Sequence, residues 1–347
     1  MEGPFYDAPL VTYLSELIPE MPFTVVDIGC SGGIHPVWLQ LGKRLRAIGV
    51  DPNIAEIERL REAWKDYKGV EHVAAFAGLP PDHPFRKQKG TAADWQDNPM
   101  HRMATFWALD LLQQRELTTN EKTEANLWQS TQLTDVAETI YMPDYFDRTG
   151  VTDVDFVKID VDGKDLEVLI SFEPSMDQLG ILGFGLEVTF FGTDSPTDNT
   201  FHNTDRFMKS KGYDLYNLTS MRRYALRALP SKFVYKSPSE GDFGRLLQAD
   251  ALFLRDLSNA KQRDLMAAWG APKLLNAMCL YALYSLPDAA ADIAVTFRDL
   301  LKSHCDVDHA LDLLTQQAQS GMDTSYTYKQ WLERFAAQDR MFYVDPQ

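Results

Sequence analysis

The chain has 347 residues, of which 34 are basic and 50 acidic, giving a formal net charge of −16. Hydrophobic residues make up 45% and charged residues 24%, which are proportions of a globular protein and not of a disordered, collagen-like or coiled-coil chain. The acidic balance makes a nucleic-acid backbone or an anionic membrane surface a poor general partner.

The first twenty residues contain acids and prolines where a signal peptide would have a basic start followed by an apolar run. No run of 18 apolar residues occurs in the sequence, so we expect no membrane span and a cytoplasmic protein. The three cysteines, Cys30, Cys279 and Cys305, contain no Cys-x-x-Cys pair. They indicate neither a disulfide scaffold nor a thiolate zinc site.

Residues 23–255 alternate short apolar runs with amphipathic stretches, which is typical of βα units around a mainly parallel sheet. The pattern predicts strands over 24–28, 45–50, 70–75, 155–159, 181–188, 214–218 and 250–254. Helical spacing is found over 54–65, 165–170 and 204–211. We therefore predict an α/β domain over residues 1–256.

An insertion over residues 80–131 interrupts this rhythm. It begins with a polar, proline-bearing stretch and continues into the apolar sequence MHRMATFWALDLLQQ. A long insertion in a compact domain often forms a lid or binding element, and the alternative is a helix packed on the domain.

Residues 257–347 lack strand patterns and predict consecutive helices, with Gly270 and Gly321 as helix stops and Asp306 near a start. This helical appendage is expected to bind a second copy or a pathway partner. Covering the active site is the alternative.

The segment Val25–Gly33, VVDIGCSGG, runs from a predicted strand into a glycine-rich turn. Such a turn at the carboxyl end of a parallel strand is where α/β sheets bind nucleotides. Asp27 stands two residues before Gly29, where it places a negative charge beside the ligand instead of leaving a bare backbone for a pyrophosphate.

Asp51 ends the second predicted strand, 24 residues after Asp27. An acid at this place can accept both hydroxyls of a ribose. The alternative is that Asp51 only caps the helix that follows.

Three carboxylates, Asp160, Asp162 and Asp165, follow the strand over 155–159 and surround a glycine. Their convergence is unfavourable unless they are hydrogen-bonded or matched by a cation. Lys158, Lys164, a metal or a cationic ligand could provide the match. For Asp162 and Asp165, capping of the next helix is the structural alternative.

These motifs resemble a known family. The order D-x-G-x-x-G-G, followed by an acid after the second strand, resembles a class I S-adenosylmethionine-dependent methyltransferase. The segment VDFVKIDVDGKDLEVL is similar to the signature of the FkbM family of methyltransferases, and the resemblance covers about residues 22–255. It implies a Rossmann-like fold with a mostly parallel seven-stranded sheet, and S-adenosylmethionine as cofactor.

The resemblance also implies roles for single residues. The cofactor's methionine portion would lie against Asp27, Gly29, Cys30, Ser31, Gly32 and Gly33, its ribose against Asp51, and its adenine near Ala77 and Gly78. Asp160, Asp162 and Glu187 would face the methyl group and the acceptor. Two family glutamates are aspartates here, at positions 162 and 165, so each carboxylate is one methylene shorter.

A hydroxyl acceptor must lose a proton, and Asp160, Glu187 or His35 is the candidate general base. For His35, packing or capping near a helix start is the alternative. Trp107 and Phe191 are candidates to line the acceptor pocket, with core packing as their alternative. A divalent metal at Asp160 and Asp162 is chemically reasonable, but no spacing of ligands supports it, and we predict no metal site.

The leading hypothesis is an O-methyltransferase acting on a hydroxyl of a sugar, glycan or secondary metabolite, the acceptor classes that the resemblance implies. A nicotinamide-dependent Rossmann oxidoreductase is a second hypothesis, disfavoured by Asp27. A non-catalytic scaffold that uses the C-terminal helices for assembly is a third.

Overall fold

The computed structural model describes residues 8–89, 138–161, 163–190, 192, 195–224, 245–257, 259–322 and 325–337. Most of the 80–131 insertion lies outside these ranges, and so do Asp162, Trp107 and Phe191. The roles predicted for these three residues stay predictions.

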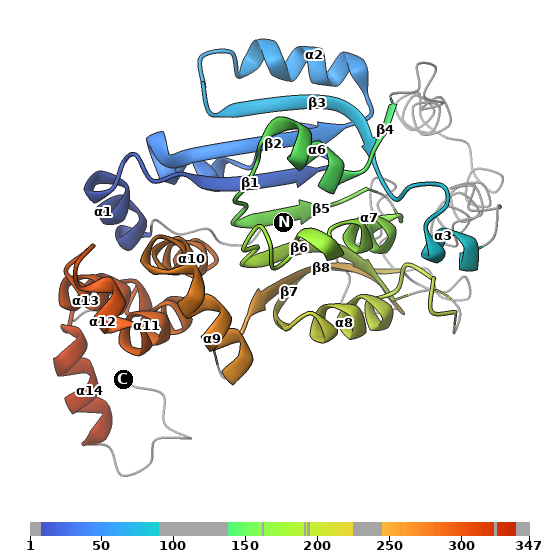
Figure 1. The fold of residues 1–347 in the computed structure, drawn as a ribbon. Coiled ribbons are helices and arrows are strands. Elements are labelled where there is room, and N and C mark those ends of the chain that lie inside the picture. Colours follow the sequence, from blue (N-terminus) through green and yellow to red (C-terminus); the bar gives the residue numbers. More distant parts are fainter. Residues whose placement is uncertain are drawn as a thin grey trace, which may run out of the picture. The chain divides into compact units, whose positions relative to one another are not determined.

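An eight-stranded sheet forms the centre of the α/β unit (Figure 1). Its strands are β1 (Phe23–Ile28), β2 (Leu45–Asp51), β3 (Val70–Ala77), β4 (Glu138–Ile140), β5 (Phe156–Ile159), β6 (Gly183–Thr189), β7 (Tyr213–Tyr224) and β8 (Arg245–Arg255). They lie in the order β4-β3-β2-β1-β5-β6-β8-β7. Strands β1, β5 and β6 pair in parallel, whereas β8 pairs antiparallel with both β6 and β7. The predicted Rossmann-like α/β class is thus confirmed.

The prediction of seven strands was wrong by one. The additional strand, β4, has three residues and extends the sheet beyond β3, with Ala75 opposite Glu138 and Ala77 opposite Ile140. Three residues are too few to show a periodic pattern, so the pairing with β3 defines this strand.

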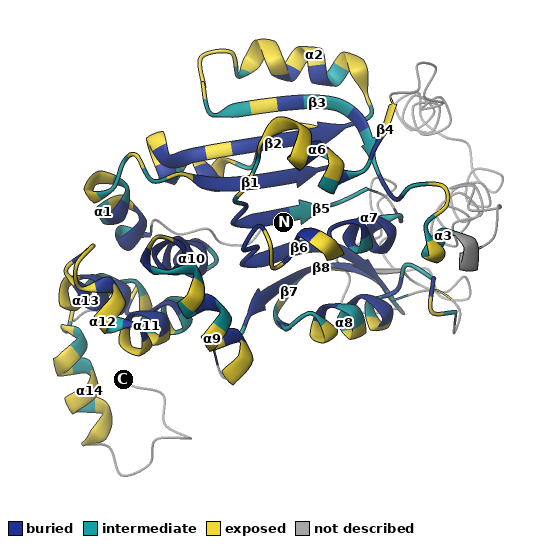
Figure 2. Cartoon of the chain, in the orientation of Figure 1, coloured by how far each residue is buried: buried dark blue, intermediate teal, exposed yellow. Residues whose placement is uncertain are grey.

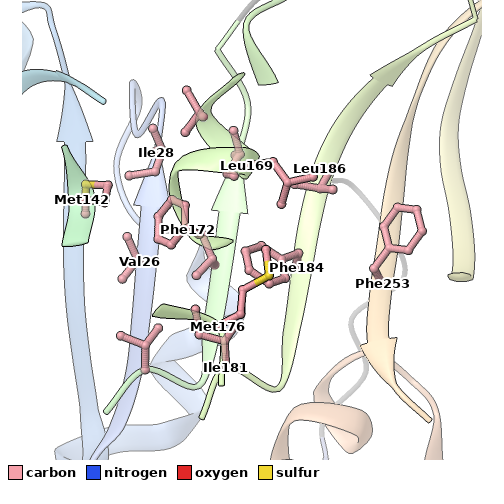
Figure 3. Close-up of a cluster of buried hydrophobic side chains, with 14 of the residues drawn as sticks. Val26, Ile28, Met142, Leu169, Phe172, Met176, Ile181, Phe184, Leu186 and Phe253 are labelled. Carbon is pink, nitrogen blue, oxygen red and sulfur yellow. The ribbon is translucent and has the colours of Figure 1, made fainter. Parts of the chain in front are cut away.

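The helices of this unit follow the predicted strands. They are α2 (Ile54–Ala63), α3 (Pro84–Lys89), α6 (Met142–Thr149), α7 (Asp165–Ser171) and α8 (Phe201–Ser210), with the short 3₁₀ helix η3 (Glu173–Ser175). Figure 3 shows part of the main core, where Met142, Leu169 and Phe172 lie close to side chains of β1, β5 and β6.

Successive side chains of β1 and β5 lie on opposite faces of the sheet, and both faces are largely buried. Val26 and Ile28 on β1, with Val157 and Ile159 on β5, belong to the core formed with α6 and α7. Successive side chains of a strand point to opposite faces. Asp27 and Lys158, which are paired near the carboxyl ends of β1 and β5, therefore share the other face and belong to the candidate site.

A second compact unit is helical and contains the described residues of 8–23, 35–46 and 256–337. Its helices are α1 (Pro9–Leu17), the 3₁₀ helix η1 (Pro36–Arg44), α9 (Ala260–Trp269), α10 (Ala271–Leu283), α11 (Pro287–Thr296), α12 (Arg298–Leu301), α13 (Val307–Ala318) and α14 (Tyr328–Ala336). The sequence pattern had grouped residues 8–23 and 35–46 with the sheet.

Helix α10 forms the centre of the second unit and is buried along nearly its whole length, whereas α14 has no buried residue (Figure 2). Arg44, at the end of η1, is buried and donates hydrogen bonds to the carbonyl oxygen of Met21 and to Oδ1 of Asn276. This guanidinium ties the amino-terminal segments to α10. Among the helices that the structure describes, none has the length and apolar character needed to cross a membrane.

Candidate functional site

The glycine-rich turn is attached to two neighbouring strands. The N–H of Gly29 donates to the carbonyl oxygen of Val50 at the end of β2, at 2.8 Å. Gly29 has a φ of +81°, and a Cβ at this position would overlap the carbonyl oxygen of Asp160 at the end of β5. Only glycine satisfies both conditions, so the turn can approach β5 this closely only with Gly29.

The other side of the turn packs on α2. Cys30 is buried with Ile57 and Leu60, and a Cβ at Gly33 would lie 3.2 Å from both Leu60 and Trp64. Burial, together with the negative charges of Asp27 and Asp51, raises the pKa of the Cys30 thiol well above its usual range. The Cys30 side chain is therefore an uncharged packing group.

Asp51 ends β2 beside this turn and is buried. Its Oδ1 accepts the N–H of Asn53 at 2.8 Å, while the Asn53 side chain caps α2 by accepting the N–H of Glu56. Burial raises the pKa of Asp51, although the backbone N–H groups of Asn53 and Ser31 partly offset this effect. The cap of α2 is thus made by Asn53, and Asp51 orients the residue that makes it.

Lys158 on β5 lies between two of the predicted acids. Its Nζ is 3.3 Å from Oδ1 of Asp27, 3.5 Å from Oδ2 of Asp160 and 3.3 Å from the carbonyl oxygen of Gly29. The strand register places Asp27 on one side of Lys158 and Gly185, which has no side chain, on the other. The lysine is therefore directed towards β1.

The charges of this group depend on one another. Burial raises the pKa of Asp27, and Lys158 opposes that rise. Burial lowers the pKa of Lys158, but the charges of Asp27 and Asp160 outweigh it and raise that pKa to about 12. Lys158 is thus protonated, and its positive charge, which comes from the protein and not from a ligand, links the carboxylates at the ends of β1 and β5.

Asp160 and Glu187 each come one residue after the last pair between β5 and β6, in which Ile159 lies opposite Leu186. The Asp160 side chain is 38% exposed, whereas Glu187 is buried. Oε1 of Glu187 accepts a hydrogen bond from Gln248 and lies 3.5 Å from the Arg222 guanidinium. Of the two carboxylates, Asp160 is the more accessible to a substrate.

Asp165 has a structural role, but it is not the cap of the following helix that was the alternative prediction. It is the first residue of α7, and its two oxygens accept the N–H groups of Val161 and Gly163, at 2.9 and 3.0 Å. Asn199 donates to the same carboxyl and accepts the N–H of Leu166. Asp165 and Asn199 therefore shape the loop that follows Asp160.

The remaining predicted residues lie in two places. Ala77 ends β3, and the N–H of Gly78 donates to the carbonyl oxygen of Ile140 on β4. His35 belongs to the helical unit, where its Nδ1 accepts the N–H of Val37 and caps η1. The capping alternative for His35 is thus observed, and its catalytic role stays a prediction.

A surface hollow of about 390 Å³ opens elsewhere, beside the start of β3, and is lined by Arg61, Lys65 and His72 among others. Arg61 donates to the carbonyl oxygen of His72, and Lys65 pairs with Glu62, so these cations already have partners. The glycine turn lies at the opposite, carboxyl ends of the strands. Among the described residues, no group of three or more His, Cys, Asp or Glu side chains is arranged to hold a metal ion.

The sequence patterns did not identify two residues that hold the loops of the candidate site, Glu56 and Asn199. Oε1 of Glu56 accepts the N–H of Gly32 at 2.9 Å. Glu56 had the appearance of an ordinary acid in the first turn of a helix, and Asn199 lies in an irregular segment. The spacing of Asn53 and Glu56 is that of a capping box, which predicts a contact within the helix and not one with Gly32, and Asn199 carries no periodic or motif signal.

Part of the chain matches a known protein family. Residues 81–215 match the family model of the methyltransferase FkbM domain. The resemblance drawn from the sequence is confirmed for these residues, and the match favours methyl transfer over the oxidoreductase hypothesis. The match begins after the glycine turn and Asp51, so it includes Asp160 and Glu187 but not the first two motifs.

The solved structures that the chain resembles are distant in sequence. A precorrin-6y C5,15-methyltransferase from Geobacter metallireducens GS-15 is 12% identical, with 71% of this chain and 86% of that chain covered and a TM-score of 0.30. An O-methyltransferase from Bacillus cereus, solved in complex with SAH, is 11% identical, with 73% and 84% covered and a TM-score of 0.32. No curated protein matches the chain.

Proposed function

We propose that this FkbM-type protein transfers a methyl group from S-adenosylmethionine to a hydroxyl of a sugar, glycan or secondary metabolite. The observation that carries the proposal is the meeting of three features at the carboxyl ends of β1, β2 and β5. These features are the glycine turn, the buried acid Asp51, and the Lys158 group with Asp27 and Asp160. Ligands of open α/β sheets bind at this edge.

The residues at this edge fit S-adenosylmethionine. Asp51 is a buried carboxylate beside the turn, as a ribose partner must be. Oδ1 of Asp27 is buried and accepts no hydrogen bond, although Lys158 pairs with it. The acids Asp27, Asp51 and Asp160 outnumber the single cation of this group, which suits a ligand that carries an ammonium and a sulfonium.

Each residue of the candidate site has a defined role in this proposal. When bound, the sulfonium supplies an electrophilic methyl group. Asp51 accepts the ribose hydroxyls, and the turn supports the methionine portion through its backbone. Asp160 accepts the proton that leaves the acceptor hydroxyl, because it directly follows β5 and its carboxylate is partly exposed. Glu187, held by Gln248 and Arg222, orients the acceptor beside Asp160.

The proposal is tested first by calorimetric titration with S-adenosylmethionine and S-adenosylhomocysteine, with NAD as the control ligand. We expect micromolar binding of the first two and none of NAD. A folded protein that binds none of the three would refute cofactor use and support the scaffold hypothesis. Binding of NAD alone would support the oxidoreductase hypothesis.

The acceptor is sought next with S-adenosylmethionine labelled in its methyl group. Hydroxylated sugars, glycans and aromatic metabolites are incubated with enzyme, and the label is located in the product by NMR. A methyl group on oxygen supports the proposal, whereas a methyl group on nitrogen would contradict its O-methyl part.

A further inference from the structure

Glu56 makes an unusual contact for an acid in the first turn of a helix. It is the third residue of α2, where a glutamate commonly folds back to accept the N–H of the N-cap residue. The N-cap is Asn53, and its N–H is already donated to Oδ1 of Asp51. Glu56 accepts the N–H of Gly32 instead, at 2.9 Å and 24 residues earlier in the chain.

Arg59 fixes the Glu56 carboxylate in this orientation. Its Nε and one terminal nitrogen donate to the two carboxylate oxygens at 2.7 and 2.6 Å. The hydrogen bonds from Arg59 and from the Gly32 N–H lower the pKa of Glu56 to about 2. Glu56 is therefore ionised at every pH at which an enzyme of this kind would be assayed.

Gly32 needs such a partner because little else restrains it. Its φ is +88°, it is exposed, and a Cβ placed on it would meet no atom within 4 Å. The neighbouring positions differ, since Gly29 adjoins Asp160 and Gly33 packs on Leu60 and Trp64. The Glu56 carboxylate thus holds the exposed centre of the turn.

The contacts form a continuous chain from Asp51 to the turn. Asp51 accepts the N–H of Asn53, the Asn53 side chain accepts the N–H of Glu56, and the Glu56 side chain accepts the N–H of Gly32. The start of α2 therefore links the proposed ribose acid to the turn proposed for the methionine portion. Three hydrogen bonds of 2.8 to 3.1 Å thus connect Asp51 with the turn.

We propose that Glu56 is a positioning residue of the cofactor site, which fixes the glycine turn relative to Asp51 and so sets the affinity for S-adenosylmethionine. This inference rests on the proposed function. It assigns a role to a residue outside the FkbM match, because Glu56 precedes residue 81.

Three variants of α2 test the role. Glu56→Ala removes the acceptor, and Glu56→Gln keeps an amide oxygen for the Gly32 N–H while losing the charge. Glu62→Ala is the matched control, because Glu62 makes the same kind of i,i+3 pair with Lys65 and is exposed. The backbone N–H of residue 56 still reaches Asn53 in every variant, so α2 keeps its cap.

Affinity for S-adenosylmethionine is measured by calorimetry, after thermal unfolding has shown that each variant is folded. We expect Glu56→Ala to bind about tenfold more weakly, Glu56→Gln to remain within about threefold of the unaltered protein, and Glu62→Ala to be unchanged. Unaltered binding by a folded Glu56→Ala protein would overturn the inference. So would a Glu56→Gln protein as weak as Glu56→Ala, because the acceptor would then not be what matters.

Amide hydrogen exchange separates this inference from the proposed function. The N–H of Gly32 should exchange faster in Glu56→Ala than in Glu56→Gln or Glu62→Ala, with no cofactor present. If the unaltered protein binds no S-adenosylmethionine, the proposed function fails, and with it the role in affinity. Unchanged exchange at Gly32 in Glu56→Ala would refute the positioning of the turn, whatever the protein binds.

Discussion

Replacement of Lys158 by methionine probes the ionic group at the ends of β1 and β5. Methionine keeps most of the length and apolar character of the lysine chain but leaves Asp27, which is 2% exposed, with an unmatched charge. Breaking a buried ion pair from one side costs about 3–5 kcal/mol. Lys158 is 21% exposed, so we expect the lower end of that range, about 3 kcal/mol.

The contact of Lys158 with Asp160 adds little to this figure. Asp160 is 38% exposed, and exposed pairs contribute at most about 1 kcal/mol. A loss of about 3 kcal/mol lowers the melting temperature of a unit of this size by roughly 6–12 °C. The measurement is thermal unfolding of the purified variant, followed by circular dichroism.

Two further variants give this experiment its controls. Lys209→Met removes a partly exposed pair with Asp205 on α8, so it should lower the melting temperature by no more than about 2 °C. Adding Asp27→Asn to Lys158→Met removes the unmatched charge and should restore more than half of the loss. The reasoning is refuted if Lys158→Met behaves like Lys209→Met, or if the double variant is no more stable than Lys158→Met.

The pH dependence of the Lys158→Met variant provides an independent check. Burial raises the pKa of Asp27 in the folded state, and loss of the lysine removes the charge that opposes this rise. An acid whose pKa is raised by folding favours the folded state at low pH, and this advantage is lost as the pH rises through the raised pKa. The destabilisation caused by Lys158→Met should therefore be smaller at pH 5 than at pH 8.

Gly29→Ala should prevent folding or lower the melting temperature by more than about 10 °C, because its Cβ would overlap the carbonyl oxygen of Asp160. In Gly32→Ala the added Cβ meets open space, so this variant should lose only about 1 kcal/mol of stability through backbone strain. Similar melting temperatures for the two variants would contradict this contrast. Asp160→Asn should lower kcat at least tenfold while the Kd for S-adenosylmethionine changes less than threefold. If kcat and the affinity for S-adenosylmethionine fell equally, Asp160 would contact the cofactor and not the acceptor. Burial raises the pKa of Asp165 to about 7, so this residue should make the protein lose stability as the pH rises from about 4 to 7. The dependence of the unfolding free energy on pH, measured by denaturant unfolding, should be weaker in Asp165→Asn. An identical pH dependence in the two proteins would exclude Asp165 as its source.

The sequence by itself determined the α/β class and the edge at which the candidate site lies. Strands such as 24–28 and helices such as 54–65 carry local periodicity, and a glycine turn after the first strand marks the carboxyl edge of a parallel sheet. Asp51 and Asp160 were predictable for the same reason, because each directly follows an apolar strand. Their roles with cofactor and acceptor stay predictions.

Only the tertiary structure decided which groups become partners. Lys158 faces Asp27 because the register of β1 and β5 brings together residues 131 positions apart, and Glu56 reaches Gly32 because Asp51 has already taken the N–H of Asn53. The same holds for Arg44, which joins η1 to α10 in the helical unit. Periodicity reports which face of an element is apolar, whereas hydrogen bonds and ion pairs depend on atoms that meet only when distant segments pack, and so no local pattern contains them.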